Sequence, residues 1–247
     1  MRSVIIVGGG TSVKEGISKG LWENIEGCSI WSCNFAYQAM PYLPTRELWV
    51  DKPFFVNNEK ELEQLAKHGV ELVAITHPLY LNNKHVTIYR KTKEKTGYKG
   101  REAFNTADTP PHIFNGKLGL VGTFALSVAI AEHYDNIYLL GYDYGTPTYG
   151  EKDTHFYQDE VQLVIKGRET PVSDKRKIQS SGVGNPNVYY KGKAGLKSVS
   201  DYDVFNEKDF KVYNVSLRSN INKFDKISYD DFFKRIENEK TNDNIDG

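Results

Sequence analysis

The sequence predicts a doubly wound, Rossmann-like α/β fold with a mostly parallel sheet and a long irregular insert that acts as a lid. Short apolar, β-branched runs alternate with helical patterns along most of the 247 residues. Several of these runs end on a glycine or a polar side chain, and ligands of such sheets bind at the carboxyl ends of the strands. We expect one domain over residues 1–247, with the insert at 146–198.

The chain opens on a strand followed by a glycine turn. Ser3 to Val7 is an apolar run typical of a buried strand, and Gly8-Gly9-Gly10-Thr11-Ser12 follows it directly. Ser12 and Glu15 have the spacing of a capping box, which predicts a helix over about 12–25. Backbone N–H groups at such a turn suit a phosphate or a carboxylate. The alternative is a tight turn that binds nothing, because neither the full dinucleotide fingerprint nor the P-loop lysine is present.

Two further strands end on polar side chains. Residues 29–34 read as a strand that closes on Asn34, and residues 47–51 as a strand that closes on Asp51. Around them we expect a short helix over 35–40, a surface helix over 59–68 and a strand over 70–76.

The second half of the chain begins less regularly. His85 to Tyr89 alternates and predicts an edge strand or a hairpin arm. Leu120 to His133 is nearly all apolar with many small residues, which indicates a helix buried against a sheet. A buried strand over 136–140 then runs into Gly141 to Gly145. Beyond the insert we expect a strand over 211–215 and an amphipathic helix over 229–236.

Composition argues against several classes of partner. Lys+Arg and Asp+Glu balance at 32 each, so nothing in the net charge favours a nucleic acid or a membrane surface. No apolar stretch reaches the roughly 18–20 residues of a membrane span, and the N-terminus lacks the apolar region of a signal peptide. Cys28 and Cys33 read as small core residues in a reducing compartment. A cytoplasmic protein is expected, and homo-oligomerisation stays open.

The order of these motifs is similar to that of a known group of transferases. Residues 4–15, Ser32-Cys33-Asn34-Phe35, the helix at 127–130 with the strand end at 136–144, and Val212-Tyr213-Asn214 with Ser219 carry the likeness. On these stretches the sequence resembles the bacterial sialyltransferases of glycosyltransferase family 42. It also resembles the wider DUF115 group, described as 6-hydroxymethylpterin diphosphokinase MptE-like.

The resemblance implies transfer of a sugar from a nucleotide-activated donor to an acceptor hydroxyl, with no obligatory cofactor or metal. It assigns the donor's phosphate and sugar to the glycine turn and Asn34, and the nucleoside to the loop after residue 140. The binding set expected on this basis is Gly8, Gly9, Gly10, Thr11, Ser12, Asn34, Thr123, Gly141, Tyr142, Asp143, Tyr144 and Ser219.

Glycosyl transfer with inversion needs a base that takes the proton of the acceptor hydroxyl. His155 is the first candidate, because it is the only histidine beyond the strand end at 141–145. Asp143 and Asp51 are the fallback bases. Each has a structural alternative, namely a packing or surface role for His155, a helix cap or a ribose contact for Asp143, and a strand-end turn for Asp51. The insert supplies groups that can close over the donor: Tyr157, Tyr189, Tyr190, Lys191 and Lys193.

Two other functions stay open. An MptE-like diphosphokinase acting on a pterin or a nucleoside would use ATP and Mg²⁺, and would need Asp51 and Asp143 to converge on the metal. A non-catalytic nucleotide-binding protein would keep the glycine turn without a base beside the bound phosphate.

Overall fold

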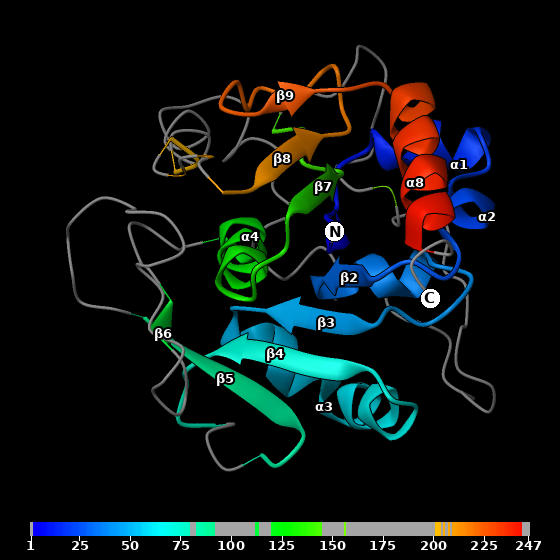
Figure 1. Cartoon of the computed structure of the whole chain (residues 1–247). Coiled ribbons are helices and arrows are strands. Elements are labelled where there is room, and N and C mark those ends of the chain that lie inside the picture. Colours follow the sequence, from blue (N-terminus) through cyan, green and yellow to red (C-terminus); the bar gives the residue numbers. More distant parts are fainter. Residues whose placement is uncertain are drawn as a thin grey trace.

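A parallel sheet runs through the computed structural model, which describes residues 2–79, 83–91, 112–113, 120–144, 156, 201–203, 205, 207 and 209–243. Nine strands lie in these residues, in the order β6-β5-β4-β3-β2-β1-β7-β8-β9, and every neighbouring pair is parallel (Figure 1). Their bounds are β1 (Ser3–Val7), β2 (Ile30–Cys33), β3 (Arg46–Trp49), β4 (Glu71–Ile75), β5 (Val86–Lys91), β6 (His112–Ile113), β7 (Asn136–Leu140), β8 (Lys211–Asn214) and β9 (Asp225–Lys226).

The direction of winding reverses beside β1. From β1 the chain adds β2, β3, β4, β5 and β6 in turn on one side, and it then returns to place β7, β8 and β9 on the other side. The loops after β1 and β7 therefore leave the sheet at a topological switch point. This arrangement confirms the doubly wound α/β fold, and the described sheet is parallel throughout.

Helices cover both faces of the sheet. Their bounds are α1 (Val13–Ser18), α2 (Leu21–Ile25), the 3₁₀ helix η1 (Asn34–Ala39), α3 (Lys52–Lys67), α4 (Val121–Ala131) and α8 (Tyr229–Asp243). Strand residues alternate between the faces: Ile5 packs in one core with the helices α1, α2, α3 and α8, and Ile6 packs in the other core with α4. Nearly every side of α4 is buried, in agreement with its apolar sequence.

The structure corrects two local expectations. The helix expected over 12–25 is divided into α1 and α2 at Gly20, which adopts a φ of +78°. Ser12 makes no side-chain cap, so the capping box is not formed. Residues 86–91 form a strand between β4 and β6, parallel to both, so this segment is neither an edge strand nor a hairpin arm. Apart from Phe156, the insert at 146–198 lies outside the described residues.

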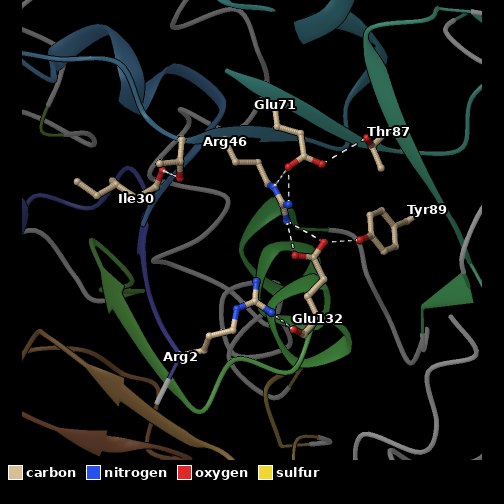
Figure 2. A network of polar contacts seen from close by, with 8 residues as sticks. Arg2, Ile30, Arg46, Glu71, Thr87, Tyr89 and Glu132 are labelled. Atoms are coloured by element: carbon tan, nitrogen blue, oxygen red, sulfur yellow. Dashed lines mark hydrogen bonds and ion pairs between the residues drawn. The ribbon is translucent and has the colours of Figure 1, made fainter. Parts of the chain in front are cut away.

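An ion-pair network centred on the buried Arg46 ties the amino-terminal edge of the sheet to α4 (Figure 2). The guanidinium of Arg46 donates to Glu71 Oε2 from Nε at 2.9 Å and to both carboxylate oxygens of Glu132 at 2.9 Å. It also lies 4.2 Å from the ring centre of Trp31, and Tyr89 donates to Glu132 Oε1 at 2.6 Å. This network holds strands and helix together at the edge opposite the switch-point loops.

No helix within the described ranges is long and apolar enough to cross a membrane.

Candidate functional site

The loops that follow β1 and β7 are hydrogen-bonded to each other at the switch point. Gly8 N donates to Leu140 O at 2.7 Å, and Gly10 N donates to Gly141 O at 2.9 Å. The third contact joins a backbone amide to a side chain, because Ser12 N donates to Asp143 Oδ2 at 2.8 Å. Two segments more than 130 residues apart in the sequence therefore form one surface.

Glycine is required on both sides of this junction. Gly141 has a φ of +69°, and a Cβ there would lie 2.8 Å from Gly8 O and 2.9 Å from Gly10 N. A Cβ on Gly10 would lie 2.5 Å from Asp143 Oδ2. The glycines thus allow two backbones and one carboxylate to approach more closely than any side chain would permit.

Three of the five amides of the glycine turn are taken by acceptors of the protein itself, whereas the sequence predicted that the turn would offer its amides to a bound anion. Those of Gly8, Gly10 and Ser12 are engaged by β7 and its loop, and the last of them is held by the protein's own carboxylate. The helix behind the turn, α1, spans six residues, so its dipole is short. Asp143 accepts a hydrogen bond from the amide of Ser12, the residue before α1, as expected for a helix cap, and it places a carboxylate at the switch point.

Three other members of the expected binding set are buried in the fold. Tyr142 is 2% exposed, and its hydroxyl lies 3.4 Å from Gly122 O and 3.8 Å from Cys33 Sγ. Thr123 donates its hydroxyl to Leu120 O at 2.9 Å. Ser219 is equally enclosed. These buried side chains support the loops of the site through contacts within the fold.

Ser219 fastens the segment after β8 to the loop after β7. Its hydroxyl donates to Tyr142 O at 2.6 Å and accepts from Asn214 Nδ2 at 2.9 Å and from Ile221 N at 3.0 Å. Asn220 adds two further hydrogen bonds between the same two segments, which we call the Ser219 clamp. Its backbone N donates to Asp143 O and its Nδ2 donates to Tyr144 O, both at 2.8 Å.

We predict that Ser219→Ala lowers the free energy of unfolding by about 1–3 kcal/mol, because a buried hydroxyl with three hydrogen bonds is removed and Ile221 N loses its acceptor. Asn214 Nδ2 and Tyr142 O keep each other as partners, at 3.2 Å. Urea unfolding followed by circular dichroism measures this loss. Ser18→Ala is the matched control, since the Ser18 hydroxyl bonds Glu15 O at the exposed surface of α1. Equal stabilities of the two variants would contradict the Ser219 clamp.

The half-buried residues of the expected set surround the junction. Gly9, Gly10, Thr11, Asn34, Asp143 and Tyr144 all have partial exposure. Asn34 follows β2, the strand beside β1, and adopts a φ of +56°. Its side-chain Oδ1 is buried without a hydrogen bond. Tyr144 has a φ of +45°, and its hydroxyl lies 3.0 Å from that of Tyr202.

The candidate bases do not share one place. Asp143 lies at the switch point, whereas Asp51 follows β3, which is separated from β7 by β2 and β1. Three strand spacings place the two strand ends roughly 14 Å apart. Burial raises the pKa of Asp51 above its ordinary value. These two carboxylates therefore do not form the converging pair that a diphosphokinase would use.

Within the described part of the chain, no group of three or more His, Cys, Asp and Glu side chains is placed to hold a metal ion.

The insert contacts the glycine turn at one described residue. Phe156 is buried, and its backbone N donates to Gly9 O at 3.0 Å. The other insert candidates, His155, Tyr157, Tyr189, Tyr190, Lys191 and Lys193, lie outside the described residues.

One acidic residue near the site was missed by the sequence reasoning. Glu47 lies in β3 with 0% exposure, and neither of its carboxyl oxygens has a hydrogen bond of normal geometry. The available signal was a glutamate at the head of the apolar run Leu48-Trp49-Val50, at a position that faces the core rather than solvent.

The described residues thus define a doubly wound parallel α/β protein whose candidate site is the junction between the β1 and β7 loops. Comparisons of the chain with models of protein families, with curated proteins and with solved structures find no match.

Proposed function

We propose that this protein binds a nucleotide-activated sugar at the β1/β7 switch point and transfers the sugar to an acceptor hydroxyl. The observation that carries the proposal is the junction itself, where the glycine turn and the loop around Asp143 meet outside the carboxyl ends of adjacent strands. Doubly wound sheets bind nucleotides at such points. The half-buried Asn34 lies one strand away, within the same edge.

The Asp143 carboxylate decides how the donor is oriented. A phosphate placed on the Ser12 amide would compete with Asp143 Oδ2 and would be repelled by its charge. We therefore assign donor hydroxyl groups, which can donate hydrogen bonds, to the neighbourhood of Asp143. The phosphates are assigned to the outer side of the turn, away from this carboxylate.

In the proposed reaction a base removes the proton of the acceptor hydroxyl while the oxygen attacks the anomeric carbon of the sugar. The bond between that carbon and the phosphate oxygen breaks, and the nucleotide leaves with the electron pair. His155 is assigned as the base, since it precedes Phe156, whose backbone amide bonds the glycine turn.

We predict that Asp143→Asn weakens binding of the donor at least tenfold and that Asp51→Asn leaves it unchanged. The side-chain amide oxygen introduced by Asp143→Asn can still accept the Ser12 N–H, so the fold is retained while the charge is lost. A thermal-shift screen of nucleotides and UDP-, GDP- and CMP-sugars identifies the ligand. One present at 100 times its Kd stabilises the protein by about 2.7 kcal/mol.

The same panel of nucleotides and nucleotide sugars also distinguishes the proposed transferase from a non-catalytic binding protein. Release of nucleoside mono- or diphosphate that His155→Ala lowers by about 10²–10⁴-fold supports the transferase. Binding without release supports the non-catalytic nucleotide-binding protein. No binding across the panel, or equal affinities of the Asp143 and Asp51 variants, overturns the assignment of the site.

A further inference from the structure

The Glu47 carboxyl group is sealed inside the fold near the switch point. In β3 its register partner is Ser32 of β2, and Ser32 is in turn the partner of Val7 in β1. Glu47 has 0% exposure, and both of its oxygens lack a hydrogen bond of normal geometry. Burying a carboxyl group without such hydrogen bonds costs folding free energy, so the presence of Glu47 at this position needs a physical explanation.

In the part of the chain that the structure describes, the groups that act on Glu47 or lie beside it come from three elements, and none of them carries a positive charge. Ser32 and the backbone amide of Asn34, at the end of β2 and the start of η1, favour the ionised form. Tyr37 of η1 and Glu61 of α3 lie on the other side, where Gln38 Nε2 donates to the Tyr37 hydroxyl at 3.2 Å and to Glu61 Oε1 at 3.4 Å.

The burial and the charges around Glu47 favour its protonated form. Burial raises the pKa of Glu47 well above its ordinary value, and the like charge of Glu61 acts in the same direction. Among the described residues the one charged group that acts on Glu47 is this second carboxylate. A protonated carboxyl can also donate a hydrogen bond to the oxygen of the neighbouring Ser32, whereas an ionised carboxylate can only accept one.

Glu47 also contacts a part of the candidate site, because the backbone amide of Asn34 acts on its carboxyl group. Asn34 and Gly9 each stand two residues beyond the paired positions Ser32 and Val7, so both follow adjacent strands at the same edge of the sheet. Asn34 begins η1 with a φ of +56°, a conformation that its surroundings must maintain. An ionised Glu47 would draw water into the contact between β3, η1 and α3 and loosen this support.

We propose that Glu47 carries a proton in the folded protein and is a positioning residue for the switch-point site, so that loss of this proton weakens ligand binding through η1 and Asn34. The binding part of this inference rests on the proposed function, and the protonation part stands without it.

The sign of the pH dependence follows from proton linkage. The folded protein binds this proton more tightly than the unfolded chain, so the stabilisation is complete below the ordinary value of 4.5 and is lost as pH rises through the raised pKa of Glu47. One proton changes the equilibrium constant of unfolding by up to tenfold per pH unit in that range.

The test compares the wild type with Glu47→Gln, which has the shape of the protonated acid and cannot ionise. Glu63→Gln is the matched control on the exposed face of α3. Urea unfolding from pH 5 to pH 9 should show that Glu47→Gln gains stability over the wild type as pH rises, by up to tenfold in the unfolding constant per pH unit. Glu63→Gln should follow the wild type. Parallel profiles of wild type and Glu47→Gln would overturn the protonation.

The Kd of the nucleotide or nucleotide sugar found in the panel is measured over the same range. It should rise with pH for the wild type and the Glu63 variant more steeply than for Glu47→Gln. An equal pH dependence of Kd in all three proteins, beside different unfolding profiles, would overturn the positioning role. If the wild type binds no nucleotide at all, the proposed function fails, and the unfolding profiles still decide the protonation.

Should Glu47→Gln not fold, ¹³C NMR of glutamate-labelled wild type titrates the carboxyl directly. A Glu47 signal that is already ionised at pH 6 would contradict the inference.

Discussion

Arg46→Ala should lower the free energy of unfolding by about 1.5–3 kcal/mol, the range for hydrogen bonds to charged groups, because Arg46 is buried while its partners Glu71 and Glu132 are partly exposed. Arg46 is 8% exposed, and its guanidinium is the common donor to Glu71 and Glu132. Without it, Tyr89 is the one side chain within the described ranges that still donates to the Glu132 carboxylate (Figure 2). The packing of the guanidinium on Trp31 is lost as well.

Chemical denaturation measures this loss, and in a thermal scan each kcal/mol corresponds to roughly 2–4 °C in Tm for a chain of this size. Arg235→Ala is the matched control, because Arg235 also lies over an aromatic ring, 4.4 Å from the centre of Tyr213, but is exposed on α8. This control should cost about 0.5–1 kcal/mol. Similar losses for the two variants would show that burial of Arg46 contributes nothing.

Gly141→Ala should have the second large effect, because it strains the junction of the candidate site. An alanine with the φ of +69° costs about 1–2 kcal/mol from backbone conformation alone. The new Cβ also lies within 3 Å of the backbone of Gly8 and Gly10, which cannot retreat without breaking the hydrogen bonds that join β1 to the β7 loop. Each such bond contributes about 1 kcal/mol, so we expect a total loss of about 3 kcal/mol.

Gly69→Ala separates the two causes. Gly69 has a φ of +88°, and a Cβ there would meet nothing within 4 Å. This variant should therefore lose only the conformational part, about 1–2 kcal/mol, and its ligand affinity should equal that of the wild type. Equal stability losses in Gly69→Ala and Gly141→Ala, measured by urea unfolding, would show that the close approach of the two loops is unimportant.

Local patterns in the sequence were sufficient for much of the fold. The apolar run of β1 and the small, apolar residues of α4 each predicted a buried element, because burial of a strand or a helix face leaves a periodic trace in the residues themselves. The predictions from these patterns were wrong at two places. Gly20 divides the first helix, and residues 86–91 form a parallel strand because their partners lie elsewhere in the chain.

The candidate site was only partly predictable. Strand ends with polar residues pointed to Asn34, Asp51 and Asp143, since parallel strands end at one edge of the sheet. Which of them meet depends on the order of the strands, and that order brings Asp143 to Ser12 while it leaves Asp51 at the end of β3, with β2 and β1 in between. The roles of Tyr142 and Ser219 behind the site likewise follow from burial that no motif records.

The sequence by itself determined that strands and helices alternate, that the sheet is parallel, and that glycine and polar residues gather at its carboxyl edge. These properties depend on the periodicity of apolar side chains and on turns that a few consecutive residues form. Only the tertiary structure decided that the Ser12 amide is taken by the Asp143 carboxylate and that Glu47 is sealed in the core. Both outcomes depend on contacts between segments that are distant in the sequence. A local sequence pattern contains no information about the free energy of such contacts.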